Sequence, residues 1–292
     1  MEKHLAAAKI NLALHVTGRL SNGYHRLDSL VTFTEFGDLV SVKPAGDLCL
    51  SISGQFSKTL SPHDDNLVLA AARALQKSAI EHGYSPGGAA IHLVKKLPIA
   101  SGIGGGSADA AATLNALCEF WQIDQSKIDL HKIAQKLGAD VPMCLASTPL
   151  RATGVGDEIE PVTLPALNIV LVNPGIEIST PEIFGALKST TSSPLPPLDK
   201  FTTVADIIEW LGKTQNDLQA AAAAIEPEIL RVSDAIMESQ DCLFARMSGS
   251  GATCFGIFST PELANTAAHD LAQRFPSWWC IVSKTIATKT KN

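Results

Sequence analysis

Cysteine is scarce in this sequence, and its spacing argues against two classes of site. Six cysteines are scattered over 292 residues, and no two of them form a Cys-x-x-Cys pair. A disulfide framework or a zinc site is built from closely spaced cysteines, so neither is expected and reduced thiols are the default. This pattern predicts a cytoplasmic protein.

Long apolar runs are missing as well. No uncharged stretch approaches the roughly 18 apolar residues that a membrane helix needs. The first residues, MEKHLAAAKINLALHV, lack the arrangement of a signal peptide, because Lys9 interrupts their apolar part. We therefore expect neither a membrane protein nor a secreted one.

Positive charge is not in excess. The chain has 23 Lys and Arg residues against 29 Asp and Glu residues, a net charge of −6. This gives no electrostatic reason to expect nucleic acid as a partner. The hydrophobic share of 46% is ample for a core and argues against disorder. A chain of 292 residues is long enough for two domains.

The sequence does contain strand and helix patterns, which do not alternate strictly. Apolar residues recur at every second position along 10–16, which predicts a strand whose other face carries Lys9 and Asn11. Further strands are predicted at 30–36, 38–44, 48–53, 89–98, 166–173, 241–248, 252–258 and 279–288, and helices at 66–83, about 107–121, about 127–137, 203–212, 215–224, 226–238 and 260–274. The composition of 189–200 predicts a loop. This mixture favours the α+β class.

A glycine-rich stretch precedes one of these helices. Residues 98–114, PIASGIGGGSADAAATL, contain four glycines in five positions. Such crowding lets backbone amides approach a ligand, most commonly a phosphate. A P-loop is excluded because no lysine follows before Lys127, and a dinucleotide fingerprint fits poorly because its third position falls on Ser107 or Asp109. An amide cradle with Ser107 as the helix cap is favoured over a turn that only allows close packing.

Three charged residues near this stretch can be explained without any role in ligand binding. Lys95 and Lys96 end a predicted strand, where lysines are ordinarily solvated. Asp109 fits a favourable acid in the first turn of a helix.

Three motifs, in order along the chain, resemble those of the GHMP kinases. The glycine stretch is similar to the ATP-binding motif of that family, and 8-AKINLALHVTGRLSNGYHRLDSLV-31 and 247-MSGSGATCFGIF-258 are similar to its N-terminal and C-terminal motifs. The resemblance implies a two-domain α+β fold, with a first domain at 1–162 like domain 2 of ribosomal protein S5 and a ferredoxin-like second domain at 163–292. It also implies ATP as phosphate donor with Mg²⁺ on the phosphates, although no carboxylate cluster marks a metal cage.

Within the family, the sequence is similar to the kinases that act on a cytidine diphosphate-linked methylerythritol. The stretches 64-DDNLV-68, 137-LGADVPMCL-145 and 173-NPGIEISTPEIF-184 carry this similarity. It implies phosphorylation of the 2-hydroxyl of that substrate, in the non-mevalonate route to isoprenoid precursors, with no obligatory protein partner. Two alternatives stay open: another GHMP small-molecule kinase of the homoserine or mevalonate type, and a non-catalytic nucleotide-binding protein.

The resemblance assigns catalysis to Asp140 and Lys9. A hydroxyl nucleophile needs a group that accepts its proton, and a carboxylate can do this. Asp140, between Gly138 and Pro142, is by itself equally well explained as a turn or cap aspartate. Lys9 would lower the pKa of that carboxylate and stabilise charge on the transferred group, whereas a lysine on a strand is ordinarily a solvated charge.

Substrate and nucleotide residues are implied in the same way. The cytosine base would stack between Tyr24 and Phe184 and bond to His25, although a hairpin tyrosine such as Tyr24 more often packs on a core. The substrate residues implied are Asn11, Tyr24, His25, Pro181 and Phe184, and the ATP residues are Asn66, Lys96, Pro98, Gly102, Gly104, Gly105, Gly106 and Ser107. The turn at 248–251 either supports the substrate pocket or only packs. The chain departs from the family at 144–159, CLASTPLRATGVGDEI, where Asp157 replaces a common glutamate.

Overall fold

The computed structural model describes residues 2–58, 60–62, 66–198 and 200–288. The chain forms two compact units that alternate along the sequence. Unit 1 comprises Met1–Ala8, Phe36–Ile99 and Gly104–Ser147, and unit 2 comprises Lys9–Glu35, Ala100–Ile103 and Thr148–Asn292. Residues 64 and 65 of the 64–68 motif lie outside the described part. The domain boundary expected after residue 162 stays a prediction.

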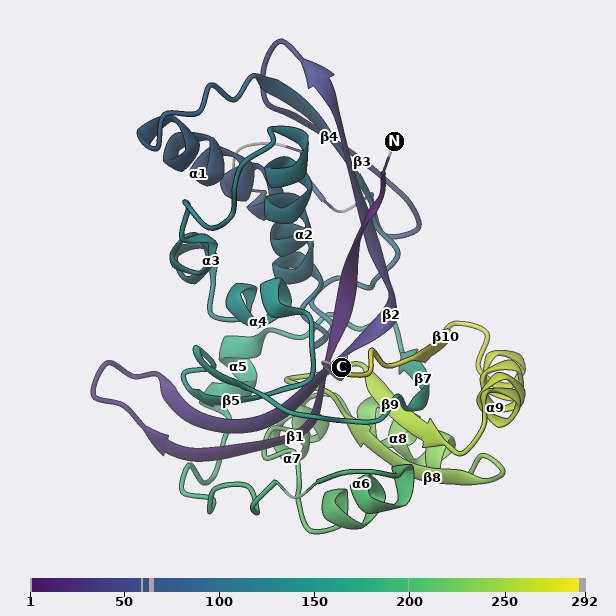
Figure 1. The fold of residues 1–292 in the computed structure, drawn as a ribbon. Coiled ribbons are helices and arrows are strands. Elements are labelled where there is room, and N and C mark those ends of the chain that lie inside the picture. The colour runs from purple at the N-terminus through teal and green to yellow at the C-terminus, as the bar shows by residue number, and fades with distance from the viewer. Residues whose placement is uncertain (1, 59, 63–65, 199, 289–292) are drawn as a thin grey trace. The chain divides into compact units, whose positions relative to one another are not determined.

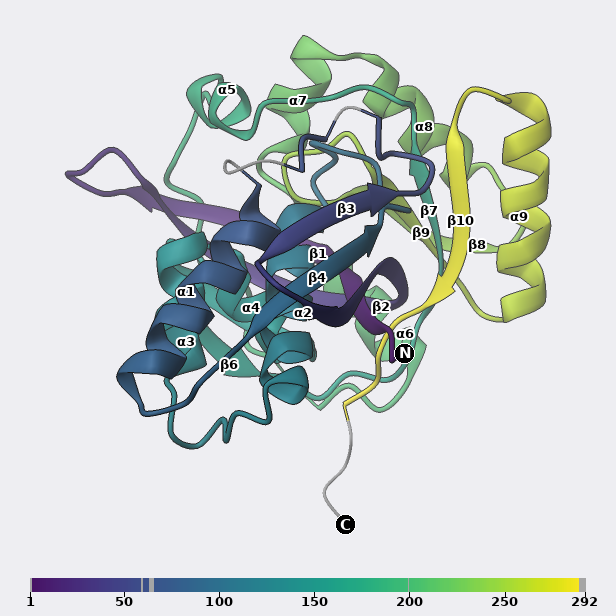
Figure 2. The same ribbon diagram turned by 90° about the horizontal axis from the view of Figure 1, so that it is seen from above.

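Unit 1 contains strands with helices on one face (Figures 1 and 2). The second half of β2 pairs with β4 in antiparallel register, with Leu39 opposite Val94, and β4 pairs with β3 in parallel. Helix α1 packs on α2, and α3 and α4 pack beside them. The elements are β2 (His25–Ala45), β3 (Cys49–Ser53), β4 (Gly88–Val94), α1 (Leu67–Glu81), α2 (Gly105–Phe120), α3 (Leu130–Leu137) and α4 (Val141–Ala146).

Unit 2 contains a four-stranded antiparallel sheet in the order β10-β7-β9-β8. Helices α8 and α9 pack against its strands. The first half of β2 pairs with β1 and with β5, which pairs with β6. The elements are β1 (His4–Arg19), β5 (Leu150–Gly154), β6 (Glu158–Pro161), β7 (Asn168–Asn173), α5 (Thr180–Gly185), α6 (Val204–Leu211), α7 (Gln219–Ile225), α8 (Glu228–Met237), β8 (Cys242–Met247), β9 (Cys254–Phe258), α9 (Pro261–Arg274) and β10 (Trp279–Lys284).

The core of unit 2 joins β1 to this sheet. Leu14 and Val16 of β1 are buried in the same cluster as Val170 of β7 and Ile229 of α8. Burial of such a side chain is worth roughly 1.5–3 kcal/mol. Strand β1, which carries Lys9 and Asn11, is therefore held in place by its apolar face.

The α+β class is confirmed, while several element boundaries differ from those expected. The strands expected at 30–36 and 38–44 are one strand, β2, because Gly37 lets the backbone approach: a Cβ there would lie 2.0 Å from the Ala6 carbonyl oxygen. Strand β4 ends at Val94 instead of residue 98, since the Lys96 and Leu97 amides donate to Asp38 Oδ1.

Other expectations about local structure meet mixed outcomes. Residues 20–24 form a turn between β1 and β2, in which Leu20 N donates to Tyr24 O and Gly23 has a φ of 90°. The short helices α4 and α5 were not expected, since six residues give too little periodicity to recognise. No helix within the described residues is both long and apolar enough to cross a bilayer.

The expected loop at 189–200 is held to the strands of unit 2 through Asp28. The Asp28 carboxylate accepts two bonds from Arg151, at 2.7 and 2.6 Å, and one from the Leu195 amide at 2.8 Å. The hydrogen bond to Asp28 also raises the pKa of Arg151. Arg151 lies in the segment that departs from the family, so this segment has a structural role of its own.

Replacing Asp28 by Asn should loosen this loop. The change removes the negative charge that strengthens the hydrogen bonds from Arg151 and the Leu195 amide. This costs about 1.5 kcal/mol, so transient opening of the loop should become about tenfold more frequent. Trypsin cleavage after Lys188 or Lys200 should accelerate by a similar factor, as followed by mass spectrometry. Glu160→Gln is the matched control, because Glu160 is an exposed acid of β6 that lies opposite Arg151, and its replacement leaves the bonds of Asp28 in place. Equal cleavage rates in both variants would contradict the assignment.

Candidate active site

The first half of the glycine stretch is bound within unit 2 through its carbonyl oxygens. Four consecutive carbonyl oxygens accept hydrogen bonds, which come from three segments of the unit. The bonds are Ile178 N to Ala100 O (3.2 Å), Thr253 N to Ser101 O (3.1 Å), Ser248 Oγ to Gly102 O (3.2 Å) and Lys9 N to Ile103 O (2.9 Å). This half of the stretch is therefore a structural segment that connects β1 to the turn at 248–251.

Gly102 is required here by close packing. Its φ is 74°, and a Cβ would lie 2.5 Å from Ser248 O and 2.6 Å from Gly251 N. Gly249 meets it from the other side, since a Cβ there would lie 2.6 Å from Gly102 O. The close-packing interpretation thus accounts for Gly102, and its assignment to ATP stays a prediction.

The second half of the stretch begins α2 in unit 1. The N-cap of α2 is Gly104, in a left-handed conformation (φ 66°, ψ 23°) with no side-chain cap, so the expectation that Ser107 caps the helix is wrong. Ser107 lies in the first turn instead. The first amides of a helix have no intrahelical partner and carry positive potential. Gly106 is exposed, with no atom within 4 Å of a hypothetical Cβ. Residues 104–107, hereafter the amide cradle, can therefore face an anion.

Lys9 and Asn11 project from the same face of β1, as expected from the alternation. Lys9 is only 5% exposed, and its Nζ donates to Asn11 Oδ1 at 3.1 Å. Asn11 Nδ2 donates to Ser29 Oγ at 2.8 Å, and Ser29 Oγ donates to Ala13 O at 2.7 Å. The solvated alternative for Lys9 is wrong. A buried ammonium of fixed orientation interacts strongly with any negative charge brought near it.

Asp140 lies in unit 1, at the start of α4. It occupies the N-cap position with helical dihedral angles (φ −84°, ψ −14°), and its side chain makes no cap hydrogen bond. Capping therefore does not explain this carboxylate. Lys9 and Asp140 belong to different units, and their pairing stays a prediction.

An aromatic pair lies in unit 2 next to the hairpin turn. The rings of His25 and Phe184 are stacked, with centroids 4.9 Å apart and an interplanar angle of 19°. Tyr24 is 63% exposed, so the core-packing alternative for it is wrong. Burial, with the charge of Arg19 second, lowers the pKa of His25, which favours the neutral imidazole. Pro181 begins α5, the helix that carries Phe184.

The residues expected near ATP have structural roles of their own. Asn66 caps α1, since its Oδ1 accepts from Val68 N at 3.0 Å. The Lys96 ammonium lies 5.7 Å from the centre of the Phe36 ring, and Pro98 is buried. Their contact with a nucleotide stays a prediction.

A buried charge cluster beside the amide cradle was not anticipated from the sequence. Lys95 is 3% exposed, and its Nζ bonds to Asp38 Oδ2 at 2.5 Å and Asp109 Oδ2 at 2.6 Å. The expectations of a surface lysine and a plain first-turn acid are both wrong. The available signal was alternation, since Lys95 continues the buried positions Ile91 and Leu93 of β4.

Asn216 was also missed, and it holds the turn at 248–251 from below. Its Nδ2 donates to Met247 O and Gly249 O, both at 2.9 Å. Ser248 Oγ accepts from Asn11 N at 3.1 Å. The turn is thus fixed from two directions, which supports its packing role. No sequence motif marks such a contact between distant segments.

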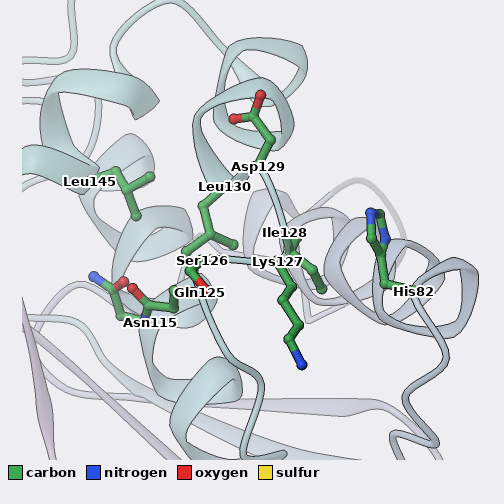
Figure 3. A pocket seen from close by; sticks show the side chains of 9 residues that line it. All are labelled: His82, Asn115, Gln125, Ser126, Lys127, Ile128, Asp129, Leu130 and Leu145. Carbon is green, nitrogen blue, oxygen red and sulfur yellow. The ribbon is translucent and has the colours of Figure 1, made fainter.

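Two hollows lined by described residues contain none of the expected site residues. Figure 3 shows one of about 580 Å³ in unit 1, where the Asp129 carboxylate points away from the other labelled side chains. The other, of about 720 Å³, lies in unit 2 beside α7 and β8. Among the described residues, no group of three or more His, Cys, Asp or Glu side chains is arranged for a metal ion.

Comparison with known proteins adds an independent line of argument. The description "GHMP kinases N terminal domain" matches residues 66–148, and "GHMP kinases C terminal" matches residues 199–277. Curated proteins called 4-diphosphocytidyl-2-C-methyl-D-erythritol kinase are similar over nearly their whole length. The one from Chelativorans sp. (strain BNC1) is 45% identical, covering 97% of this chain and 96% of the relative. The one from Agrobacterium fabrum (strain C58) is 46% identical, covering 96% and 95%.

Solved structures agree with these matches. A crystal structure of 4-(cytidine 5'-diphospho)-2C-methyl-D-erythritol kinase is similar with a TM-score of 0.81 and 30% identity, covering 98% of this chain and 100% of that one. Homoserine kinase from Cytophaga hutchinsonii is similar with a TM-score of 0.66 and 17% identity, covering 98% and 94%. The latter likeness concerns the fold alone.

Alanine at two glycines of the stretch should separate packing from ligand access. Gly102→Ala should lower the thermal midpoint, because its Cβ meets backbone atoms and overpacking costs about 1–3 kcal/mol. Gly106→Ala should leave the midpoint unchanged or raise it, since its Cβ meets open space and alanine favours helices. Calorimetry of both variants checks this. A midpoint unchanged in Gly102→Ala would refute the packing role.

Proposed function

The chain belongs to the GHMP kinase family, and from this premise we propose that it phosphorylates the 2-hydroxyl of 4-diphosphocytidyl-2-C-methyl-D-erythritol with ATP. Curated relatives of that name match almost the entire chain, which supports both the reaction and the substrate. The pathway is then the non-mevalonate route to isoprenoid precursors, and the enzyme acts in the cytoplasm without an obligatory protein partner. The family domains at 1–162 and 163–292 belong to the same proposal.

The stacked pair of His25 and Phe184 is the observation that carries the substrate assignment. A flat aromatic surface suits a pyrimidine base, and base stacking is worth about 1–3 kcal/mol. Tyr24, exposed beside the pair, supplies a second aromatic surface. Neutral His25 can accept or donate a hydrogen bond at the edge of the cytosine. Homoserine and mevalonate carry no base, so they would make no use of these three side chains.

In the proposed reaction, Asp140 accepts the proton of the substrate hydroxyl. The hydroxyl oxygen forms a bond to the γ-phosphorus, the bond from that phosphorus to the bridging oxygen breaks, and ADP leaves. Lys9 would lie against the transferred group and stabilise its charge. The contact of Lys9 with Asn11 fixes the ammonium in advance, which is the condition for electrostatic catalysis. Asn11 and Pro181 would contact the substrate.

On the nucleotide side, the amide cradle would bind the phosphates of ATP. Gly104, Gly105, Gly106 and Ser107 form the first turn of α2 and its cap, and four such amides at a helix end suit an anion. Asn66, Lys96, Pro98 and Gly102 would line the approach. Mg²⁺ would be coordinated mainly by the phosphate oxygens, because the described part of the chain shows no carboxylate cage.

The substrate assignment predicts a clear preference among alcohols. Purified protein with ATP should phosphorylate the cytidine diphosphate-linked alcohol, while homoserine and mevalonate should give less than about 1% of that kcat/KM, since a stacking contact and bonds to a polar edge are lost. Coupled detection of ADP measures all three. Turnover of homoserine or mevalonate in preference to the cytidine compound would transfer the chain to the alternative kinase class.

The base assignment predicts a large kinetic effect of Asp140→Asn. Turnover should fall about 10²–10⁴-fold, because the hydroxyl loses its proton acceptor, while ATP affinity should stay within about twofold. Asp129→Asn is the matched control, since Asp129 caps α3 in the same unit and asparagine caps equally well.

Single-turnover rates and calorimetric ATP titration distinguish the possibilities for Asp140. Unchanged turnover in Asp140→Asn would refute the role of the base. Wild-type protein that binds ATP but transfers no phosphate to any of the three alcohols would favour the non-catalytic alternative.

A further inference from the structure

The buried cluster of Asp38, Lys95 and Asp109 joins three segments of unit 1. Lys95 Nζ bridges Asp38 Oδ2 in β2 and Asp109 Oδ2 in the early part of α2. Asp38 Oδ1 accepts the amides of Lys96 and Leu97, so one carboxylate holds the backbone that follows β4. All three charged side chains are at most 4% exposed. Their geometry is therefore fixed by their mutual bonds.

The cluster lies directly beneath the amide cradle. A Cβ built on Gly105 would lie 3.1 Å from Lys95 Nζ and 3.8 Å from Asp38 Oδ2. Gly105 and Asp109 are one helical turn apart, and Asp109 O accepts from Thr113 Oγ1 at 2.7 Å. Any change in the charge of this cluster therefore alters the electrostatic potential at the amides that would face the phosphates.

The cluster holds two carboxyl groups and one ammonium group, which leaves its charge dependent on one proton. Asp109 Oδ1 is buried with no hydrogen-bond partner among the described residues. Burial, with the negative charge of Asp38 also contributing, raises the pKa of Asp109 to about 8, although Lys95 opposes the shift. This shift favours the protonated form of Asp109 at neutral pH.

The groups around Asp109 come from the elements that pack against α2. The charged side chains that face it are Lys95, from the segment after β4, and Asp38, from β2. Helices α1, α3 and α4 pack against α2 and bury apolar side chains and the Cys144 thiol. Burial raises the pKa of Cys118, on α2 itself, to about 11, so that thiol stays neutral in the same range.

We propose that Asp38, Lys95 and Asp109 are positioning residues for the nucleotide, because they hold the amide cradle in place. The proton on Asp109 keeps the cluster neutral, so that the cradle can bind phosphate. The proposal rests on the function proposed above, in that the ligand is ATP. With the proton present, the cluster is neutral and the potential of the helix end is unopposed. Without it, a net negative charge lies one turn from the phosphates.

The direction of the pH dependence follows from linkage. An anion bound at the cradle favours protonated Asp109, so the pKa of Asp109 is higher in the complex than in the free protein. Affinity for ATP should therefore be constant below about pH 8 and fall above it, by up to about tenfold per pH unit. The last ionisation of a phosphate, near pH 6, is complete in this range and does not contribute.

The free energy of unfolding should also depend on the protonation of Asp109. The unfolded chain releases the Asp109 proton near pH 4, whereas the folded chain keeps it to about pH 8, so the Asp109 contribution falls as pH rises between these values. Below pH 4 this contribution is fully present. Asp109→Asn should remove this part of the pH dependence.

The test uses full-length protein and calorimetric titration with ATP and Mg²⁺ between pH 7 and pH 9.5. Wild-type Kd should be flat to about pH 8 and then rise, whereas Asp109→Asn, which imitates the neutral acid, should give a flat profile throughout. Glu119→Gln is the matched control, because Glu119 is an exposed acid at the far end of α2. Its profile should follow the wild type. Thermal unfolding of each variant over the same pH range confirms that the proteins are folded and reports the stability effect.

The outcomes separate this proposal from the one before it. A flat wild-type profile, or a profile in Asp109→Asn equal to that of the wild type, overturns the role of the cluster while leaving the kinase assignment intact. Absence of ATP binding at pH 7 overturns the proposed function and this inference together. Loss of the pH dependence in Asp109→Asn alone supports the inference, since a purely structural role would weaken binding equally at every pH.

Discussion

Four consecutive carbonyl oxygens, from Ala100 to Ile103, organise the candidate site of unit 2. Backbone carbonyls that leave water must find donors, because an unpaired buried acceptor costs about 1–3 kcal/mol. Here the donors come from β1, from the segment before α5, and from Ser248 and Thr253, which lie in the turn at 248–251 and just after it. The same bonds that satisfy the loop therefore fix Lys9 in position, since its own amide donates to Ile103 O. The position of Lys9 therefore follows from the hydrogen-bonding needs of a backbone segment that has no catalytic role.

Buried lysines serve two different purposes in this chain. Lys9 donates to the amide oxygen of Asn11, a contact that helps to fix the direction of its ammonium group. Lys95 is held between two carboxyl groups, so its charge is neutralised within the cluster. A buried charge costs several kcal/mol unless it is paired, and it gains most where negative charge appears during a reaction. The two carboxyl partners of Lys95 tie it to β2 and α2, so this lysine supports the start of the helix.

The sequence predicted the α+β class, the family and most elements, because alternation in β1 and the glycine stretch are local signals. It did not predict the cap of α2, since Ser107 is a good cap residue by type and only the left-handed conformation of Gly104 excludes it. Nor did it predict the partners of Lys95: Asp38 lies 57 residues away, and the bond depends on Gly37 letting β2 continue past Ala6. Such contacts are properties of tertiary packing, which a single-sequence pattern does not contain.

The glycines of this short stretch thus meet two separate structural requirements at neighbouring positions. Gly102 removes a side chain so that two backbones can touch, and Gly104 supplies a left-handed turn from which α2 can start. Gly106 borders open space at this helix end, whereas a Cβ on Gly105 would lie 3.1 Å from Lys95 Nζ. In the proposed complex with ATP, the charge of the Asp38, Lys95 and Asp109 cluster and the amides at the start of α2 would act on the same phosphates. The proposed phosphate site would depend on the proton held by Asp109 as well as on the backbone amides of residues 104–107.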